Sequence, residues 1–593
     1  MLRRMEARNA GSVHSGGRNS GGRVGMAVIL HGLHARPPLS VVLPAALQHV
    51  GLGSVTLVFP LLVAEAAGAD AWTTVRYLEL SMLAIGIGTL LQCLGRCGIG
   101  SGFLIPAVCA AVYLPISLAA ARTGGLGAVA GLTIAAGLTE ALLSRAVRRL
   151  RAYLPTEVVG IVVLTIGIIL GLLGLRLMLG FGPGAQGAGG PADWGVGLAA
   201  LAVIVGASVR GGPRLRSVAV LVGLAGGSLL HLAVGLAQGG GDAPAPASNL
   251  GTIVWPLVTP RWDLALLPGF LVGALACLVR ASGDIVASQR ANDPGWRRAD
   301  FRTVRDGALA DGLGTAVAGL LGTMGVNTYT GSVGLATATG ITARRVGLAV
   351  GLLWVAFALL PGASTVLLAI PRGVLGAALF FTAAFIVATG MSILAQRLLD
   401  ARRTVVVGFA FVVALSYDAL PDLYAGLPGS ARGLLSSSLV LGMVCALGLN
   451  ALLRIGVYRP AAVRWRPEEG PAALTAFMAE VGAGWGARAE AVGRACDLLE
   501  EFAEAAPTVV TPGEAAEITA RFDEFNLDLV LRWRGEPLPA GPVALTLDNT
   551  SEGADDAAIA AGLAAVLLRR HADRVATATS ADGRQELHAH IEH

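Results

Sequence analysis

The chain has 593 residues, of which 54% are hydrophobic and only 14% are charged, and its formal net charge is +5. This composition is typical of an integral membrane protein and excludes an ordinary soluble enzyme. The positive charge comes mainly from loop arginines, so it does not indicate nucleic-acid binding.

Residues 1–36 begin with a stretch rich in Gly, Ser and Arg that lacks the apolar core of a signal peptide, and we expect a disordered cytoplasmic leader. From about residue 39 to 456, apolar stretches recur that are long enough to cross ~30 Å of hydrocarbon. We predict about fourteen membrane segments, several of them interrupted by Gly or Pro. Their centres are expected near Gln48, Ala84, Val108, Gly131, Thr165, Leu201, Leu224, Cys277, Gly314, Gly334, Leu353, Phe385, Phe411 and Met443.

Arginine-rich connections alternate with connections that carry few positive charges. The rich ones lie near residues 145–151, 210–216, 289–305 and 397–403, whereas Glu65–Thr74 and Gln238–Asn249 are poor in arginine. The positive-inside rule places the arginine-rich connections in the cytoplasm. With an even number of spans, both termini are then cytoplasmic, as expected for a multi-pass protein of a bacterial-type inner (plasma) membrane.

Two segments in corresponding places of the two halves, Gly98–Pro115 and Gly322–Gly340, are punctuated by Gly and small polar residues. Paired interrupted segments of this kind indicate the binding site of a transporter. A half-helix that begins at such a break presents free N–H groups to a solute. Non-helical backbone at this depth is tolerated where it lines a cavity.

The segment Cys277–Ala287, CLVRASGDIVA, places Arg280 and Asp284 on one helical face inside the membrane part. A guanidinium at the bilayer centre costs ~2.5–3.5 kcal/mol on insertion scales, and such residues usually mark a solute pathway. The alternative is a structural ion pair that neutralises itself.

Five segments together resemble the xanthine/uracil permeases, also called nucleobase–ascorbate transporters, over residues 37–457. They are Ala46–Val63 with the pair Gln48-His49, Leu154–Gly171, Asp306–Thr323 with the pair Asp311-Gly312, Thr328–Gly347, and Ile370–Gly390 followed by Asp400. The resemblance implies an all-α polytopic membrane protein of two inverted seven-segment repeats, divided into core and gate domains. It also implies a homodimer that moves purine or pyrimidine bases by an elevator-like motion.

The chain departs from the family where the resemblance implies substrate contacts. Arg280 stands in place of a glutamate that binds the base, Asp284 stands where the family has His or Asp, and Gly331 and Ser332 replace an acid or amide and an asparagine. The full set of expected substrate-binding residues is Arg280, Asp284, Phe103, Thr330, Gly331, Ser332 and Thr56. Residues near the site with an expected structural role are Gln48, His49, Asp311 and Asn327.

Three explanations of these departures stay open. The first explanation is that Arg280 binds an anion or electron-rich oxopurine such as urate or deprotonated xanthine, because its planar guanidinium group can donate to two acceptors at once. Alternatively, Arg280 only neutralises Asp284, and the backbone N–H groups of Gly331 and Ser332 bind an ordinary base. The third explanation is that the chain is a non-transporting sensor that signals through its tail. A sulfate-type anion transporter is a further alternative.

Asp284 is the expected coupling residue, as the only carboxylate left at the inferred site. Because a neighbouring arginine favours its ionised form, we predict proton coupling that is weaker than in an ordinary family member, or absent. The sequence indicates no catalytic residue, no metal site and no cofactor.

Residues 460–593 have a soluble character and predict an α+β cytoplasmic domain. We expect helices over Leu474–Ala506 and Asp555–Arg570, strands over Phe525–Trp533 and Val543–Leu547, and a hairpin of Arg574–Thr579 with Arg584–Ile591. The order resembles the C-terminal half of the ATP-binding domain of histidine kinases and anti-sigma factors. An expected Asn after Glu500-Glu501 and a DxGxG loop are missing, so the resemblance implies a degenerate regulatory or assembly module without ATPase activity.

Overall fold

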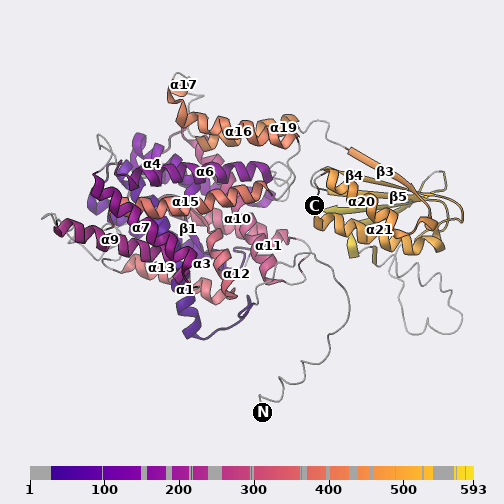
Figure 1. Cartoon of the computed structure of the whole chain (residues 1–593), viewed down its shortest axis with the longest axis horizontal. Helices are drawn as coiled ribbons and strands as arrows, with labels where there is room; N and C mark the ends of the chain where they lie inside the picture. Colours follow the sequence, from indigo (N-terminus) through magenta and orange to yellow (C-terminus); the bar gives the residue numbers. More distant parts are fainter. Residues whose placement is uncertain are drawn as a thin grey trace, which may run out of the picture.

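The computed structural model describes the chain from residue 29 to residue 592, in a largely helical part followed by a smaller part with a sheet (Figure 1). The described range has gaps at residues 96–97, 148–155, 182–189, 213–214, 217, 238–256, 294–295, 297–298, 361, 363–369, 396–400, 426–437, 454–458, 486, 488, 524–525, 539–566, 569 and 581. The predicted leader, Asp400 and the strand Val543–Leu547 lie outside the described residues, as does most of the helix Asp555–Arg570.

The first half of the helical part runs from α1 to α9. Its elements are α1 (Leu39–Ser54), η3 (Val55–Leu57), α2 (Val58–Ala66), α3 (Ala71–Leu94), β1 (Ala107–Cys109), η4 (Ala111–Tyr113), α4 (Leu114–Leu143), η5 (Ser144–Ala146), α6 (Thr156–Met178), α7 (Pro191–Arg210) and α9 (Ala219–Ala237). Within α4, Gly125 has a φ of 67°, so this element is two helices joined at a break.

The second half runs from α10 to α19. Its elements are α10 (Leu267–Asn292), α11 (Phe301–Leu320), β2 (Val326–Thr328), α12 (Thr330–Thr339), α13 (Arg344–Leu359), α15 (Arg372–Leu394), α16 (Ala401–Ala419), α17 (Pro421–Ala425) and α19 (Ser438–Leu453). Every predicted segment centre except one falls in a described helix, and the exception, Val108, lies in β1.

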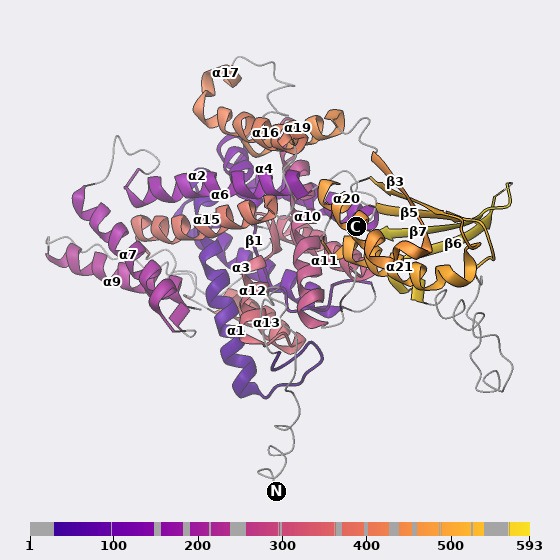
Figure 2. The ribbon, with the colours of Figure 1, turned by 45° about the vertical axis from the view of Figure 1, so that its right-hand side comes forward.

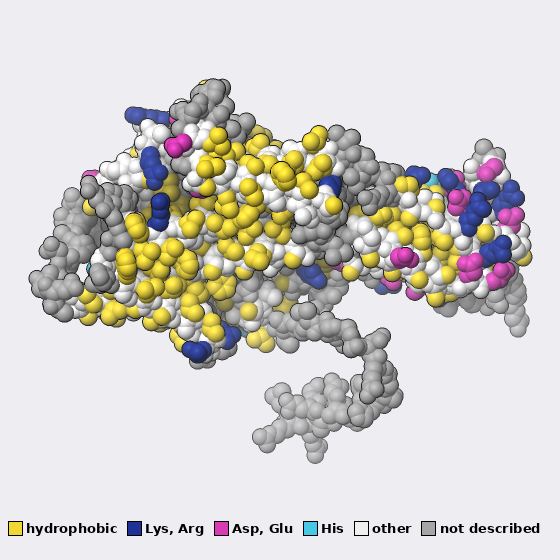
Figure 3. Space-filling model, turned by 45° about the horizontal axis from the view of Figure 1, so that its top comes forward, with side chains coloured by type: hydrophobic (Ala, Val, Ile, Leu, Met, Phe, Trp, Pro, Cys, Tyr) yellow, Lys and Arg dark blue, Asp and Glu magenta, His cyan; other side chains and the backbone are white. Residues whose placement is uncertain are grey.

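The helical part has the composition and surface of a membrane protein. Six of its described helical stretches are long and apolar enough to cross a membrane, and three shorter apolar helices accompany them. Large hydrophobic side chains such as Leu172, Phe385 and Phe409 are exposed. Figure 3 shows hydrophobic side chains spread over the helical part, with charged ones at its margins. Such a surface suits contact with lipid hydrocarbon.

Helices α3 and α11 cross at the centre through matching glycines. Both carry the sequence Gly-x-Gly-Thr, which is Gly86–Thr89 in α3 and Gly312–Thr315 in α11. A Cβ on Gly314 would lie 3.2 Å from the Cα of Gly88, so the two backbones are close enough that larger residues would have to push them apart.

The same motif packs each helix against a partner from the other half of the chain. A Cβ on Gly86 would lie 2.9 Å from the carbonyl oxygen of Gly351 in α13, and a Cβ on Gly312 would lie 2.8 Å from that of Gly137 in α4. The contact of α3 with α13 is therefore repeated by the contact of α11 with α4.

The two short strands are held by the threonine of each motif. The N–H of Ala107 in β1 donates to the Thr89 hydroxyl across 3.0 Å, and the Thr315 hydroxyl donates to the carbonyl of Val326 in β2. Strands β1 and β2 pair antiparallel, with Val108 opposite Asn327. The two segments predicted to be interrupted therefore meet each other, and α12 begins directly after β2.

The remaining helices form a second group. Helix α6 packs along α15, α7 along α9, and α16 along α19, with further contacts of α15 with α7 and of α16 with α6. An ion pair of 2.9 Å between the buried side chains of Arg403 and Glu157 joins α16 to α6. Arg403, predicted to lie in a cytoplasmic connection, is therefore a buried helix residue.

The C-terminal part is a five-stranded antiparallel sheet in the order β3-β4-β5-β7-β6, with α20 and α21 packed on it (Figure 2). Its elements are β3 (Arg459–Trp465), η6 (Pro467–Glu469), α20 (Pro471–Trp485), α21 (Ala489–Val509), β4 (Ala516–Phe522), β5 (Asn526–Trp533), β6 (Arg574–Thr579) and β7 (Gln585–Glu592). The predicted helices correspond to α20 and α21, the predicted strand to β5, and the predicted hairpin to β6 and β7. Strands β3 and β4 were not predicted.

Candidate functional site

The junction between β2 and α12 gathers the polar residues of the two halves. Asp284 of α10 is buried and accepts a hydrogen bond of 2.9 Å from the Thr328 hydroxyl. The carboxylate of Asp311 in α11 accepts from the Asn327 amide at 2.6 Å and from the Thr328 N–H at 2.9 Å. Strand β2 is thus clamped between two carboxylates from two different helices, which fixes the direction in which α12 starts.

Arg280 lies one helical turn before Asp284 on α10, partly exposed. Its charge acts on Asp284 and Asp311, yet within the described ranges it forms no hydrogen bond and no ion pair within 4.0 Å. Among the described residues the Asp284 carboxylate accepts from Thr328 rather than forming a direct ion pair with Arg280, while the charge of Arg280 still acts on it.

The N-terminus of α12 is shaped by contacts of Tyr329. The Tyr329 side chain does not cap the helix, and its ring lies within 2.9 Å of the place where a Cβ on Gly331 would stand. The Tyr329 ring therefore takes up part of the space that a side chain at position 331 would fill. The N–H of Ser332 donates to the Tyr329 carbonyl across 3.0 Å, so this N–H is already satisfied. Thr330 and Gly331, in contrast, are exposed.

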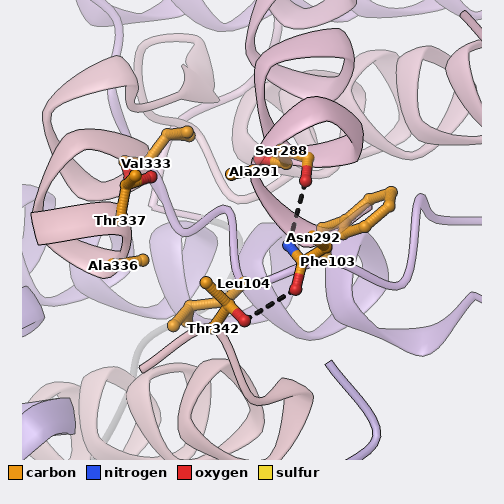
Figure 4. A pocket seen from close by; sticks show the side chains of 9 residues that line it. All are labelled: Phe103, Leu104, Ser288, Ala291, Asn292, Val333, Ala336, Thr337 and Thr342. Atoms are coloured by element: carbon orange, nitrogen blue, oxygen red, sulfur yellow. Dashed lines mark hydrogen bonds between the residues drawn. The ribbon is translucent and has the colours of Figure 1, made fainter. Parts of the chain in front are cut away.

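Phe103 lines a pocket farther along the same face of α10 (Figure 4). The pocket is lined by Phe103, Leu104, Ser288, Ala291, Asn292, Val333, Ala336, Thr337 and Thr342. The Asn292 amide donates to the Ser288 carbonyl at 2.9 Å and accepts from the Thr342 hydroxyl at 2.6 Å. Because Ser288 and Asn292 follow Asp284 at steps of four residues, the pocket continues from the Asp284 site along one helical stripe.

The residues expected from the first helix lie in α1 and η3. The buried Thr56 hydroxyl donates to the carbonyl of Gly53 at 2.8 Å, which is a local contact. His49 is buried, and its Nδ1 has no hydrogen-bond partner in the described part of the chain. Gln48 is half-buried. Among the described residues, none of these three side chains forms a hydrogen bond or an ion pair with Arg280 or Asp284.

Sequence reasoning missed a buried acid next to the site. Glu140 of α4 is fully buried and interacts with Asp311, and the hydroxyl of Tyr113 and the thiol of Cys277 are close enough to share its electrostatic environment. Asp284 is therefore not the only carboxylate at this level of the protein. The signal was present, because Glu140 interrupts an otherwise apolar segment.

A comparison with family profiles matches residues 41–423 to the one described as the permease family of xanthine and uracil permeases. The chain belongs to the xanthine/uracil permease family. The matched range contains both carboxylates that clamp β2, Arg280, and both short strands. Membership makes the protein a multi-pass membrane transporter with a nucleobase-type solute, and it supports transport rather than catalysis as the activity.

Curated members of this permease family align along most of their length. The xanthine permease XanP of Escherichia coli is 27% identical over 72% of this chain and 94% of its own, and the xanthine permease XanQ is 28% identical over 72% and 94%. The uric acid transporter UacT of Escherichia coli is 26% identical over 68% of this chain and 84% of its own.

Among solved structures, the murine Slc26a9 anion transporter in its inward-facing state superposes with a TM-score of 0.49 and 13% identity, over 78% of this chain and 77% of that one. A TM-score below 0.5 is too weak a likeness to support any conclusion about this permease.

Proposed function

We propose that this permease carries a purine or pyrimidine base or a related oxopurine anion, of the xanthine, urate and uracil class, across the membrane. The observation that carries the proposal is the position of Arg280, which lies near two clamped carboxylates without being bound by either. The names of XanP, XanQ and UacT support the same class of solute.

The solute is placed between Arg280, Asp284 and the start of α12. A planar guanidinium offers parallel N–H donors, which match two adjacent acceptors on an oxopurine. The first N–H groups of α12 and its dipole favour a partial negative charge on the solute. Asp284 is held by Thr328 and can accept a ring N–H of the base. Thr330 and Ser332 complete the polar side, and Phe103 and Thr56 are assigned to its periphery.

The transport motion is proposed to be an elevator-like movement of a core domain against a gate domain. The proposal of two inverted seven-segment repeats is supported by the repeated Gly-x-Gly-Thr contacts of α3 and α11 and by the antiparallel pairing of β1 with β2. The gate assignment is supported by the mutual packing of α6, α7, α9, α15, α16 and α19. A homodimer through these gate helices, with both termini cytoplasmic, completes the proposed arrangement.

The domain limits proposed from the sequence are a leader over residues 1–36, a transporter over 37–457 and a cytoplasmic regulatory domain over 460–593. The last is supported by a separate hydrophobic core that includes Trp465, Phe502 and Trp533. The alternative proposal is a non-transporting nucleobase sensor, in which solute binding to the helical part changes this tail.

Thermal unfolding of the purified full-length protein tests the solute class. Binding to the native state alone raises the apparent stability, by about 2.7 kcal/mol at a hundredfold excess over Kd. We expect a rise with xanthine or urate that is lost in Arg280→Glu. A rise in stability with sulfate, but with none of the bases xanthine, hypoxanthine, urate and uracil, would contradict the proposal. A rise with uracil or hypoxanthine that survives Arg280→Ala would assign base binding to the backbone of α12 instead.

A further inference from the structure

Glu140 and Asp311 are two neighbouring carboxyl groups that are both buried, an arrangement that the solute site does not require. Glu140 is fully buried, and in the described part of the chain no N–H or hydroxyl group donates to either of its carboxyl oxygens. Asp311 is 5% exposed and is its neighbour. A buried carboxylate without a partner is strongly destabilising, so a carboxyl in this position is expected to hold a proton.

The backbone brings the two acids together. Helices α4 and α11 touch at Gly137 and Gly312, where a Cβ on Gly137 would lie 2.6 Å from the carbonyl oxygen of Gly312. Glu140 is one helical turn after Gly137, and Asp311 directly precedes Gly312. Because the helices cannot separate at this crossing without losing their packing, the two side chains are held within reach of each other.

The other half of the protein shows that this packing does not need two acids. In the equivalent crossing of α13 with α3, Gly351 takes the place of Gly137 and Gly86 that of Gly312. Counted from these glycines, Trp354 stands where Glu140 stands and Ile85 where Asp311 stands, and both are buried apolar residues. The same helix crossing is thus built once with apolar residues and once with two carboxyl groups, which indicates that the acids serve another purpose.

The titratable and charged groups around the pair come from two elements, η4 and α10. Tyr113 of η4 and Cys277 of α10 are buried beside it, and the Tyr113 hydroxyl is without a hydrogen-bond partner among the described atoms. Arg280 and Asp284 of α10 act on Asp311 from the solute site. The single positive charge in this group is shared with Asp284, so it does not balance two further ionised acids. Two neighbouring carboxyl groups in such a place share one proton.

We propose that Glu140 and Asp311 form the proton-binding pair of this permease, with one proton held between their carboxyl groups and exchanged during transport. The inference rests on the proposed function for its role in coupling, although not for the presence of the proton. It differs from the weak or absent coupling predicted from the sequence, which considered Asp284 as the only carboxylate at the site and did not consider Glu140.

The hydrogen bonds around β2 connect the Glu140–Asp311 pair to the proposed solute site. Asp311 accepts from the N–H of Thr328, whose hydroxyl donates to Asp284. When the proton leaves, Asp311 takes more negative charge and binds the Asn327 amide and the Thr328 N–H more strongly. Strand β2 is followed by α12, so stronger binding of β2 to Asp311 shifts the start of α12, where the proposed solute meets Arg280.

Infrared spectroscopy of the full-length protein in liposomes tests for the proton without any solute. We expect the C=O band of a protonated carboxyl group at neutral pH, lost in Glu140→Gln and shifted but retained in Glu140→Asp. Glu65→Gln is the matched control, because Glu65 is paired with Arg372 at 3.3 Å at a more exposed position and should contribute no such band. Absence of the band from the unaltered protein, or its persistence in a folded Glu140→Gln protein, would overturn the proposal.

Transport by the same proteoliposomes tests the coupling. With an inward proton gradient, the unaltered protein should accumulate xanthine, whereas Glu140→Gln should exchange labelled for unlabelled xanthine but lose accumulation. Accumulation that is unchanged in Glu140→Gln would refute the coupling role. If neither the unaltered protein nor its variants bind or exchange any base, the proposed function fails. The infrared result then decides by itself whether Glu140 and Asp311 hold a proton.

Discussion

The side-chain amide of Asn327 donates a hydrogen bond of 2.6 Å to the carboxylate of Asp311. This contact joins the middle of β2 to α11, and the N–H of Thr328 makes a second bond to the same carboxylate at 2.9 Å. Since α12 begins two residues after Thr328, the two bonds set the position of the half-helix on which the proposed solute site depends.

Replacing Asn327 tests this clamp. Asn327→Ala leaves an oxygen of Asp311 buried without its amide donor, and we expect a loss of about 1–3 kcal/mol of stability together with weaker xanthine binding. Thermal unfolding and ligand-dependent stabilisation measure the two effects. Thr382→Val on α15 is the control, because the Thr382 hydroxyl only donates to a carbonyl of its own helix, that of Ala378, across 2.9 Å. Equal stability of the two variants would disprove the clamp.

Arg280 is predicted to determine affinity for anionic oxopurines. Arg280→Ala should weaken urate binding by about 10- to 100-fold, which corresponds to the ~1.5–3 kcal/mol of a hydrogen bond to a charged group. Equilibrium binding of labelled urate to the purified protein measures the change. Arg290→Ala on the same helix is the matched control, since its guanidinium lies 5.8 Å from the Trp296 ring centre and belongs to the far end of α10. An affinity that is unchanged in Arg280→Ala would leave this residue without a role in binding.

The crossing of α4 with α11 should not accept a larger residue. In Gly312→Val, the Cβ would lie 2.5 Å from the N of Ala141, and we expect overpacking that costs about 1–3 kcal/mol or more. Gly283→Ala on α10 is the control, because nothing lies within 4 Å of the place where its Cβ would stand. Melting temperatures in detergent compare the two, and a Gly312→Val protein as stable as Gly283→Ala would contradict the close contact.

Transport should survive removal of the C-terminal part. The helical part and the C-terminal part have separate hydrophobic cores, so a chain that ends after α19 keeps its own packing. We expect this shortened chain to take up xanthine in proteoliposomes at a rate comparable to that of the full chain. If it binds xanthine but transports none, while the tail of the full chain becomes protected from proteolysis on binding, the sensor alternative is correct.

Much of the fold could be predicted because membrane segments are specified locally. About twenty apolar residues are needed to cross the hydrocarbon, and this requirement is visible in the sequence itself. The four-residue step from Arg280 to Asp284 likewise fixes their common face on any helix. Strand β4 was missed although Ala516, Ile518 and Phe522 alternate with more exposed residues, because its apolar side chains are small or widely spaced.

The site depended on contacts between segments that are far apart in the sequence. That Thr328 rather than Arg280 binds Asp284, that the Tyr329 ring covers Gly331, and that Glu140 meets Asp311 all follow from how α4, α10 and α11 pack around β2. The sequence by itself determined which segments enter the membrane and which residues carry charge into it. Only the tertiary structure decided which of these charges are partners, because helix crossings depend on the fit of backbones and side chains across the whole bundle rather than on local spacing.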